Sequence, residues 1–416
     1  MSVHARADVI VVGAGPAGST AAALLAERGV RVRVLEKETF PRFHVGESLL
    51  PAAGVLEERL GVTPEPEAFL FKGGAQFVCE ATGRVAAFDF AEALPGPPRH
   101  AWHVDRALYD TLLRDRAVAM GAEVQHGVRV DDVEVGDDRA TVRTTHGRHE
   151  ARFVFDATGL DRLMARRRRT VEPYRHFGKA AVFRQYEGVR DATFEEMGAA
   201  NDIRIMIVPG GWGWVIPLPR RRLSIGLVKR DRGVSRGDLD AYVHGSPLLS
   251  RWTAGAEPGP VHIVGNYSFR NTRPYAPRIA SIGDAACFID PVFSSGVSLA
   301  AAGAQAAVER LVPALAEGRE ADPHLMAPVG EHMGVAYDTF ASLVYRFYNT
   351  RFVDNLIFNA PTDGALRASV ISVLGGDVFR DDSPFRDMLL ASRSQPWRGE
   401  APAGARRGVR EGPVGR

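Results

Sequence analysis

The stretch Asp8-Val9-Ile10-Val11-Val12-Gly13-Ala14-Gly15-Pro16-Ala17-Gly18 decides the fold of the first part of the chain. Its β-branched run, Asp8 to Val12, predicts a short buried strand, and the Ala-rich segment from Pro16 to Arg28 predicts a helix directly after the glycines. A second strand, Val30 to Leu35, follows and ends at Glu36. Strand, glycine turn, helix and strand in this order make up a βαβ unit of the kind that binds dinucleotides.

Each glycine of this turn has a physical role. Gly13 allows the tight turn, Gly15 lets the backbone approach a pyrophosphate, and Gly18 permits close packing of helix on strand. The free N–H groups at the helix N-terminus favour phosphate. Glu36 stands 23 residues after Gly13, where an acid meets the adenosine ribose hydroxyls.

Composition narrows the class of protein. With 416 residues, 45% of them apolar and 25% charged, the chain is typical of a globular protein with two or three structural regions. A formal net charge of +2 excludes strong electrostatic steering to nucleic acid. The segment from Ser394 carries five Arg against two Glu and little apolar surface, which predicts a disordered tail over 394–416.

Cysteine content and hydropathy indicate the compartment. Cys79 and Cys287 are the only cysteines, which fits a reducing environment and gives neither a disulfide framework nor zinc-ligand spacing. The N-terminus enters a strand with no secretory pattern, and the apolar segment Ile279 to Ala302 is interrupted by Asp284 and Asp290. We expect a cytoplasmic protein that binds no membrane.

Lysine is rare in this chain. Of the 52 basic residues only four are lysine: Lys37, Lys72, Lys179 and Lys229. Since arginine supplies positive charge almost everywhere else, each lysine raises the question of whether its primary amine is needed. The alternative for any one of them is chance survival on a solvated face.

Later segments complete the architecture. Trp102 to Ala119, with Arg106 near its start, predicts a helix, while Phe153 to Gly159 and Ile279 to Asp284 predict buried strands. Alternating apolar residues in Lys72 to Asp89 and Ala180 to Val228 predict a separate antiparallel sheet. The pattern from Val329 to about Ala391 is helical and aromatic; its rings would line a pocket or form an ordinary core.

One strand carries an unusual pair of indoles, in Trp212-Gly213-Trp214-Val215-Ile216-Pro217. Trp212, Trp214 and Ile216 alternate, so on a strand all three face one side and form a large rigid wall. Without further context, a packed sheet face explains them. Together with the dinucleotide fingerprint, W-x-W-x-I-P resembles the flavin-dependent halogenases, which use reduced FAD, oxygen and halide to chlorinate or brominate electron-rich organic substrates.

The resemblance implies a fold and a role for several residues. It implies an α/β chain with a glutathione-reductase-type FAD-binding fold, a substrate-domain sheet and a C-terminal helical region. The indole wall would stand beside the flavin and keep the organic substrate away from it. Arg106 and the Gly283-Asp284 pair match positions that contact FAD in this family. The alternatives are a surface arginine and a helix N-cap aspartate.

A second motif lies in Gly283 to Leu299. Phe288, Pro291, Ser294 and Gly296 have the spacing of the family's F-x-x-P-x-x-S-x-G, and a helix is expected to begin at Gly296 and run to Leu311. The resemblance implies that the amides of Ser295 and Gly296 hold the halide, since helix N-termini bind anions. Phe293 stands where tryptophan halogenases commonly have Glu, which favours the branch acting on phenols, pyrroles or carrier-tethered aromatics.

Lys72 lies in Phe71-Lys72-Gly73-Gly74-Ala75-Gln76-Phe77, which resembles the K-x-G-x-x-F segment around the family's catalytic lysine. A primary amine can hydrogen-bond hypohalous acid, protonate it or become a haloamine, and its pKa falls readily on burial, unlike that of a guanidinium. Pro41 to Ser48 matches the P-R-x-x-V-G-E-S loop, in which Arg42 and Ser48 would contact FAD. His44 could carry protons, although a solvent-facing histidine is the simpler expectation.

These motifs divide the chain into four predicted regions. They are an FAD-binding domain (1–69, 101–162 and 270–315), a substrate-domain sheet (70–100 and 163–269), a helical cap (316–393) and the tail. No second G-x-G-x-x-G follows a strand, so we expect no nicotinamide domain and a separate flavin reductase as partner.

Two other readings remain open. They are a single-component FAD and NAD(P)H aromatic hydroxylase and a flavin-binding protein without turnover that assists biosynthesis. The arginine clusters at Arg166 to Arg169 and Arg220 to Arg222 would dock an acidic carrier domain or form a solvated face.

Overall fold

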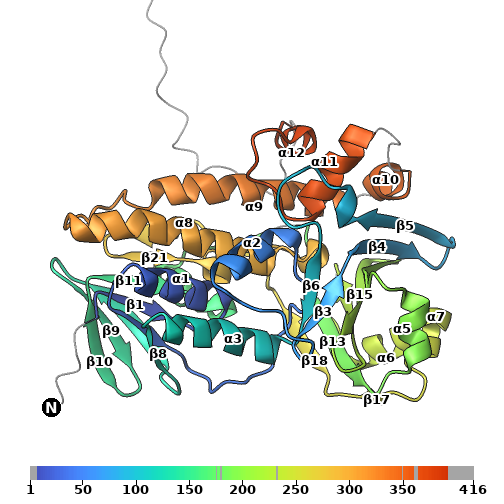
Figure 1. Cartoon of the computed structure of the whole chain (residues 1–416), viewed down its shortest axis with the longest axis horizontal. Helices are drawn as coiled ribbons and strands as arrows, with labels where there is room; N and C mark the ends of the chain where they lie inside the picture. The colour runs from blue at the N-terminus through green and yellow to red at the C-terminus, as the bar shows by residue number, and fades with distance from the viewer. Residues whose placement is uncertain are drawn as a thin grey trace, which may run out of the picture.

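The computed structural model describes residues 7–174, 176–178, 180–230, 233–348, 350–359 and 364–391. The predicted tail and Lys179 lie outside these described residues. Two sheets stand side by side, and long helices cross above them (Figure 1). Among the described helices, none combines the length and apolarity needed to cross a membrane.

The first sheet is built around the dinucleotide-binding unit. Its strand order is β20 (Tyr275–Ala276), β21 (Ile279–Ser281), β11 (Phe153–Asp156), β1 (Val9–Val12), β2 (Val32–Leu35) and β7 (Glu123–Gln125). The strands from β21 to β7 run parallel, and only the edge pair β20–β21 is antiparallel. The expected order of strand, helix and strand is therefore present.

Both faces of this sheet are covered, which explains why its strands are continuous apolar runs. Val9 and Val11 of β1 pack under helices α1 (Pro16–Glu27), α3 (Arg106–Ala119) and α8 (Gly296–Ala316). Ile10 and Val12 face the other side, toward the meander of β8 (Val130–Val135), β9 (Ala140–Thr144) and β10 (Gly147–Ala151). Helix α2 (Pro51–Arg59) packs against α8.

The second sheet contains β15 (Gly211–Leu218), the strand that carries the indole wall (Trp212, Trp214 and Ile216). Its order is β17 (Glu257–Pro258), β13 (Ala180–Glu187), β16 (Arg222–Lys229), β15, β14 (Ile203–Val208), β4 (Gly74–Cys79) and β5 (Arg84–Asp89), with β18 (His262–Gly265) also on β13. The sheet is antiparallel except for the parallel pair β14–β4. Helices α5 (Asp191–Met197), α6 (Arg236–Gly245) and α7 (Pro247–Trp252) cover its outer face.

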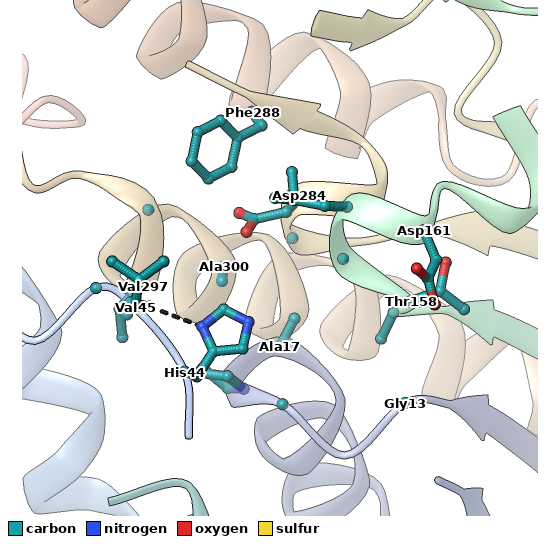
Figure 2. Close-up of a pocket in the computed structure, with 18 of the residues that line it drawn as sticks. Gly13, Ala17, His44, Val45, Thr158, Asp161, Asp284, Phe288, Val297 and Ala300 are labelled. Carbon is teal, nitrogen blue, oxygen red and sulfur yellow. Dashed lines mark hydrogen bonds between the residues drawn. The ribbon is translucent and has the colours of Figure 1, made fainter. Parts of the chain in front are cut away.

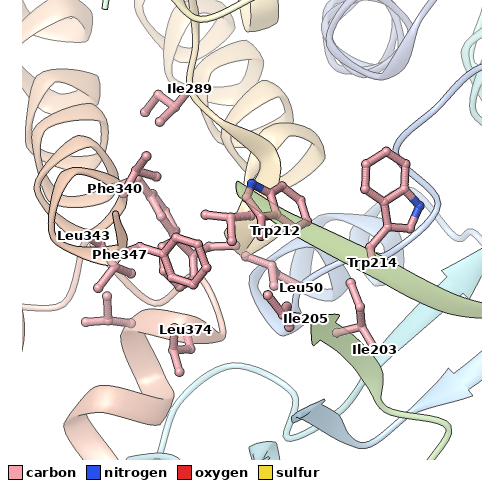
Figure 3. Packing of buried hydrophobic residues seen from close by; sticks show 14 of the residues in the cluster. Leu50, Ile203, Ile205, Trp212, Trp214, Ile289, Phe340, Leu343, Phe347 and Leu374 are labelled. Carbon is pink, nitrogen blue, oxygen red and sulfur yellow. The ribbon is translucent and has the colours of Figure 1, made fainter. Parts of the chain in front are cut away.

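The inner face of this sheet meets the C-terminal helices. Trp212 packs in one cluster with Phe340 and Phe347 of α9 (Ala327–Phe347) and Leu374 of α11 (Gly364–Leu374), as Figure 3 shows. Between these helices lie α10 (Thr350–Phe352) and the π-helical turn η5 (Val353–Phe358), and α12 (Pro384–Leu390) closes the layer. Of the aromatic rings in this region, Phe340 and Phe347 are buried core residues, whereas Tyr337, Tyr345, Tyr348, Phe352 and Phe358 are partly buried against the same cluster, and Tyr337 also lines the cavity described below.

Smaller elements join the two sheets. They are α4 (Leu163–Arg168), the strand pair β3 (Phe69–Lys72) and β6 (Ala101–Val104), the strands β12 (Val171–Pro173), β19 (Phe269–Asn271) and β22 (Cys287–Phe288), and the 3-10 turns η1 (Phe90–Glu92), η2 (Gly159–Asp161), η3 (Gly283–Ala285) and η4 (Pro291–Phe293).

Two expectations about element boundaries were wrong. Ala101–Val104 is a strand rather than the start of a helix, because it pairs with β3 and Asp105 then caps α3 through the N–H groups of Ala107 and Leu108. Lys72 belongs to β3 and not to the large sheet, which begins two residues later at Gly74. This offset places Lys72 at the junction of the sheets.

Glycines of β15 and β16 make room for large side chains on both faces of the second sheet. Trp212, Trp214 and Ile216 face the same side of β15, while the intervening Val215 packs on the opposite face. Gly226 lies opposite Trp214 in the neighbouring strand, and a Cβ there would overlap the indole ring. Gly213 faces the other side, where a Cβ would overlap the Tyr242 hydroxyl. The wall therefore depends on Gly226 of β16 as well as on its own tryptophans, while Gly213 makes room for Tyr242 of α6 on the opposite face.

We predict that Gly226→Ala destabilises the protein by about 1–3 kcal/mol, the usual cost of an added methyl group in a packed core. The measurement is urea unfolding followed by circular dichroism. The matched control is Gly237→Ala in α6, where the nearest atom to an added Cβ would be 3.8 Å away and alanine favours the helix. Equal stability of Gly226→Ala and the unaltered protein would contradict this account of the wall.

Candidate functional site

A cavity of about 700 Å³ lies between the two sheets. It is lined by glycines of the β1–α1 turn at one end and by the indole wall at the other. The residues singled out from sequence that line it are Gly13, Gly15, Glu36, Arg42, Ser48, Arg106, Trp212, Trp214, Ile216, Asp284, Pro291, Ser295 and Gly296. Ala14, Gly18 and Lys72 are not part of its lining.

The glycine turn shows the geometry that a pyrophosphate requires. Gly13 has a φ of +102°, and a Cβ there would stand 2.5 Å from the carbonyl oxygen of Ala157. A Cβ on Gly18 would overlap the carbonyl oxygen of Gly13, so Gly18 serves packing. Gly15 differs, since its added Cβ would meet only Arg42 Nη2 at 3.7 Å. The space beside Gly15 is therefore open for a ligand.

Glu36, directly after β2, accepts a hydrogen bond from the backbone of this turn. Its Oε2 accepts the N–H of Ala14 at 2.7 Å, and its Oε1 accepts the N–H of Glu38 at 2.8 Å. A carboxylate oxygen has lone pairs for further donors, so the buried Glu36 can also accept ribose hydroxyls from the cavity. The same carboxylate thus orders the turn and faces the ligand.

A buried ion-pair cluster holds the 41–48 loop against the cavity. Arg106 donates to both oxygens of the fully buried Asp110, at 2.8 and 3.0 Å, and to the carbonyl oxygen of Val45 at 2.7 Å. Arg42 donates to the same Asp110 at 3.1 Å. The loop is thereby fixed to α3.

The structure corrects the expectation of a solvent-facing His44. Its side chain is half-buried and lines the cavity across from Asp284, and its Nδ1 lies 2.7 Å from the carbonyl oxygen of Val45 (Figure 2). Burial and the nearby Arg106 lower the pKa of His44 to about 4. The imidazole is therefore neutral near pH 7.

The second sequence motif brings a helix start to the cavity. Helix α8 begins at Gly296, as expected, and extends to Ala316. The carboxylate of Asp284, from η3, lies 4.0 Å from the position of a Cβ on Gly296. Burial raises the pKa of Asp284 to about 7, opposed by the charge of Arg106. Partial neutralisation of Asp284 reduces the repulsion that an anion would meet here.

The indole wall bounds the cavity. The ring centroids of Trp212 and Trp214 are 5.7 Å apart, and Trp214 Nε1 donates to Ser224 Oγ at 3.1 Å. Behind Trp212 the rings of Phe77, Phe293 and Phe347 pack at centroid distances of 5.7 to 6.5 Å. The wall therefore separates the cavity from an aromatic cluster.

Lys72 is completely buried, with 0% of its surface exposed, and lies just outside the cavity lining. Its Nζ donates to Ser48 Oγ at 2.9 Å and to the carbonyl oxygen of Leu49 at 2.7 Å. Burial lowers the pKa of Lys72 to about 7, although the charge of Asp202 opposes that shift. The amine is thus partly neutral at pH 7, as nucleophilic chemistry requires.

Sequence reasoning missed Glu47. This side chain is 1% exposed and lines the cavity; Gln185 donates to its Oε1 at 3.1 Å, while its Oε2 has no partner among the described residues. Burial raises the pKa of Glu47. Its place in the V-G-E-S segment was the available signal, but only the tertiary structure shows that the carboxyl is buried.

The arginine cluster at 220–222 is fully paired with acidic side chains. Arg220, Arg221 and Arg222 pair with Glu67, Asp191 and Asp105 at 2.7, 2.8 and 2.6 Å. Arg166 and Arg167 line the cavity. At 220–222 the ion pairs favour a solvated face over a docking patch for an acidic carrier. Among the described residues, no group of His, Cys, Asp and Glu side chains is arranged to hold a metal ion.

Comparison with known proteins identifies the family. The model of the tryptophan halogenase family matches residues 8–97 and 96–358. The chain is 29% identical over 431 residues to a 1H-pyrrole-2-carbonyl-(peptidyl-carrier protein) chlorinase of Pseudomonas fluorescens, with 94% of each chain covered. It is 31% identical over 351 residues to a sulochrin halogenase of Aspergillus terreus, covering 73% of this chain and 62% of that protein.

Solved structures of flavoproteins have a similar fold. A flavin-dependent brominase superposes with a TM-score of 0.79 at 25% identity, covering 93% of this chain and 98% of that one. A flavoprotein/dehydrogenase of Cytophaga hutchinsonii superposes with a TM-score of 0.82 at 26% identity, covering 92% and 96%. The chain belongs to the tryptophan halogenase family of flavin-dependent halogenases.

The cavity fits the FAD cofactor of this family. The open space at Gly15, the free lone pairs of Glu36 and the helix start at Pro16 would hold the pyrophosphate and ribose. Reduced FAD, when bound, would supply two electrons to oxygen, so that one oxygen atom becomes water and the other oxidises halide, the second substrate, to hypohalous acid.

We predict that Gly15→Val abolishes FAD binding, because the isopropyl group would occupy the space that the pyrophosphate needs. The variant should fold, since the first added carbon would meet no atom nearer than 3.7 Å. FAD titration monitored by fluorescence checks the prediction. Gly233→Val, where an added Cβ would meet open space, is the control that should retain FAD. Wild-type affinity in folded Gly15→Val would place the pyrophosphate elsewhere.

Proposed function

We propose that this halogenase transfers chlorine or bromine to an electron-rich aromatic substrate, a phenol or a pyrrole, either free or tethered to a carrier protein. Buried Phe293 next to Ser294 supports this branch of the family. Support also comes from the likeness, over 94% of each chain, to a chlorinase whose name specifies a pyrrole on a peptidyl carrier. The paired arginines at Arg220 to Arg222 give no support to docking at that surface.

The division of roles among the site residues is part of the proposal. The amides of Ser295 and Gly296 hold the halide at the start of α8, while Arg42 and Arg106 orient the loop beside FAD. The indole wall keeps the organic substrate out of the cavity, so that only a small oxidised halogen species passes from the cavity to the substrate. Lys72 then receives that species and delivers it to the aromatic ring. The observation that carries the proposal is the buried Lys72 amine, which donates a hydrogen bond to Ser48, a residue of the cavity lining.

A partner must supply the electrons. The chain has no second dinucleotide fingerprint, and we propose that a separate flavin reductase delivers reduced FAD. We also propose a cytoplasmic location, which rests on two unpaired cysteines, Cys79 and Cys287.

We predict halogenated product from a phenol or pyrrole substrate only when oxygen, halide and a flavin reductase or chemically reduced FAD are all present. Mass spectra of parallel chloride and bromide incubations show the isotope pattern of the halogen added. The protein alone should oxidise NAD(P)H slowly. Rapid substrate-stimulated NAD(P)H oxidation with a hydroxylated product in the absence of halide would instead establish the aromatic hydroxylase.

We predict that Lys72→Ala and Lys72→Arg both lose about 100-fold or more of halogenated product, the usual range for loss of a proton-transfer group. Arginine keeps the charge but is too weak a base to replace the amine. FAD binding and flavin reoxidation should stay near normal, with peroxide released instead. In the unaltered protein, product per oxidised flavin should rise with pH through about 7, where Lys72 becomes neutral.

Lys229→Arg, at the end of β16 and outside the cavity lining, is the matched control and should leave the product unchanged. Substantial product from Lys72→Arg would remove Lys72 from the catalytic residues.

A further inference from the structure

The hydroxyl of Ser48 is the contact between the cavity and the buried amine. Ser48 lines the cavity, and Lys72 does not. The Ser48 backbone is held in place by a β-bridge to His103, and its side chain is 6% exposed. Its Oγ accepts a hydrogen bond from Lys72 Nζ at 2.9 Å. A molecule formed in the cavity therefore meets Ser48 before it meets Lys72.

The hydrogen-bonding capacity of Ser48 suits it to act between two groups. A serine hydroxyl donates one hydrogen bond and accepts others. The acceptor position of Ser48 is taken by Lys72, and within the described part of the chain no acceptor is recorded for the Ser48 proton. That proton is available to an oxygen in the cavity.

The surroundings of Lys72 direct its amine toward Ser48. The other polar contact of Nζ is the carbonyl oxygen of Leu49 at 2.7 Å, and the Phe90 ring lies 5.2 Å from Nζ. A carbonyl oxygen accepts a hydrogen bond but has no proton to give. Ser48 is therefore the contact of the amine through which a proton can be exchanged with the cavity.

We propose that Ser48 is a proton relay between hypohalous acid in the cavity and the amine of Lys72, an inference that rests on the proposed function. The neutral amine attacks the halogen, so that an N–halogen bond forms and the oxygen–halogen bond breaks. The leaving hydroxide takes the proton of Ser48 Oγ, and Oγ takes a proton from Nζ. In the net reaction, the amine and hypohalous acid give a haloamine and water, and the Ser48 hydroxyl is regenerated.

This assignment differs from a role for Ser48 in holding FAD. A hydroxyl needed for cofactor contact would affect FAD affinity when removed. A relay would affect only the transfer of halogen, and it would also affect the charge state of Lys72. Because Ser48 Oγ accepts a hydrogen bond from Nζ, its removal takes away a contact that favours the charged ammonium. The pKa of Lys72 should therefore fall further in Ser48→Ala.

The scarcity of lysine makes this charge state measurable. The protein has four lysines, so a sample labelled with ¹³C-lysine gives few side-chain signals, and Lys72→Arg identifies the one from Lys72. Titration of this signal reports the pKa without flavin, halide or substrate. We expect a lower value in Ser48→Ala and one near that of the unaltered protein in Ser48→Thr, which keeps a hydroxyl.

Activity measurements complete the test. Under excess reduced FAD and halide, Ser48→Ala should lose about 100-fold of halogenated product and release peroxide, as expected for loss of a proton-transfer group. Ser48→Thr should recover most of the product. Ser268→Ala is the matched control: Ser268 is also 6% exposed, and its hydroxyl has no partner among the described residues. It should behave like the unaltered protein in every assay.

Three outcomes would overturn the relay. They are near-normal product from Ser48→Ala, failure of Ser48→Thr to recover product that Ser48→Ala has lost, and loss of FAD affinity in folded Ser48→Ala. The last would restore the role in cofactor contact. Failure of the proposed function is distinguishable: without halogenase activity the unaltered protein would make no halogenated product, and without a catalytic role for Lys72 the Lys72→Ala variant would still make it. If Lys72→Ala is inactive and Ser48→Ala active, only the relay is wrong.

Discussion

The buried ion pair between Arg106 and Asp110 is the interaction on which the site depends. Asp110 is fully buried, and a buried carboxylate is tolerated only when charged donors satisfy its oxygens. Arg106 and Arg42 do so, and Arg106 also binds the carbonyl oxygen of Val45. Because these contacts fix the 41–48 loop to α3, they also fix Ser48, the residue that contacts Lys72. Removing one partner would leave an uncompensated charge and release the loop.

The rest of the arrangement separates two environments. On one side lies a cavity that fits FAD, with polar groups and the start of α8. On the other side lies an aromatic cluster that includes Phe77 and Phe347. The indole wall lies between them, and Gly226 leaves room for the ring of Trp214. Under the proposed function this separation has a purpose, because the oxidant formed in the cavity would leave it only by way of Ser48 and Lys72.

Burial shifts the pKa values of several titratable groups at or beside the cavity toward their uncharged forms. His44, Glu47, Asp284 and Lys72 all have pKa values displaced toward their uncharged forms, in each case mainly through loss of solvation. A group whose pKa lies near the ambient pH can exchange protons readily. A carboxyl group that is uncharged also does not repel an anion bound by backbone amides. Under the proposed function, burial of the site would favour both anion binding and proton transfer.

The sequence by itself determined the dinucleotide-binding unit, the one-sided placement of Trp212, Trp214 and Ile216, and the start of α8 at Gly296. These features follow from local periodicity and backbone preferences, which act over a few residues. Only the tertiary structure decided that Ala101–Val104 is a strand, that His44 faces the cavity, that Glu47 is buried and that Lys72 lies behind Ser48. Each of these depends on a partner distant in sequence: β3 for Ala101–Val104, α8 and Asp284 for His44, Gln185 for Glu47, and the 41–48 loop for Lys72. Local sequence cannot encode such contacts, because burial and solvation are set by the elements that pack around a residue.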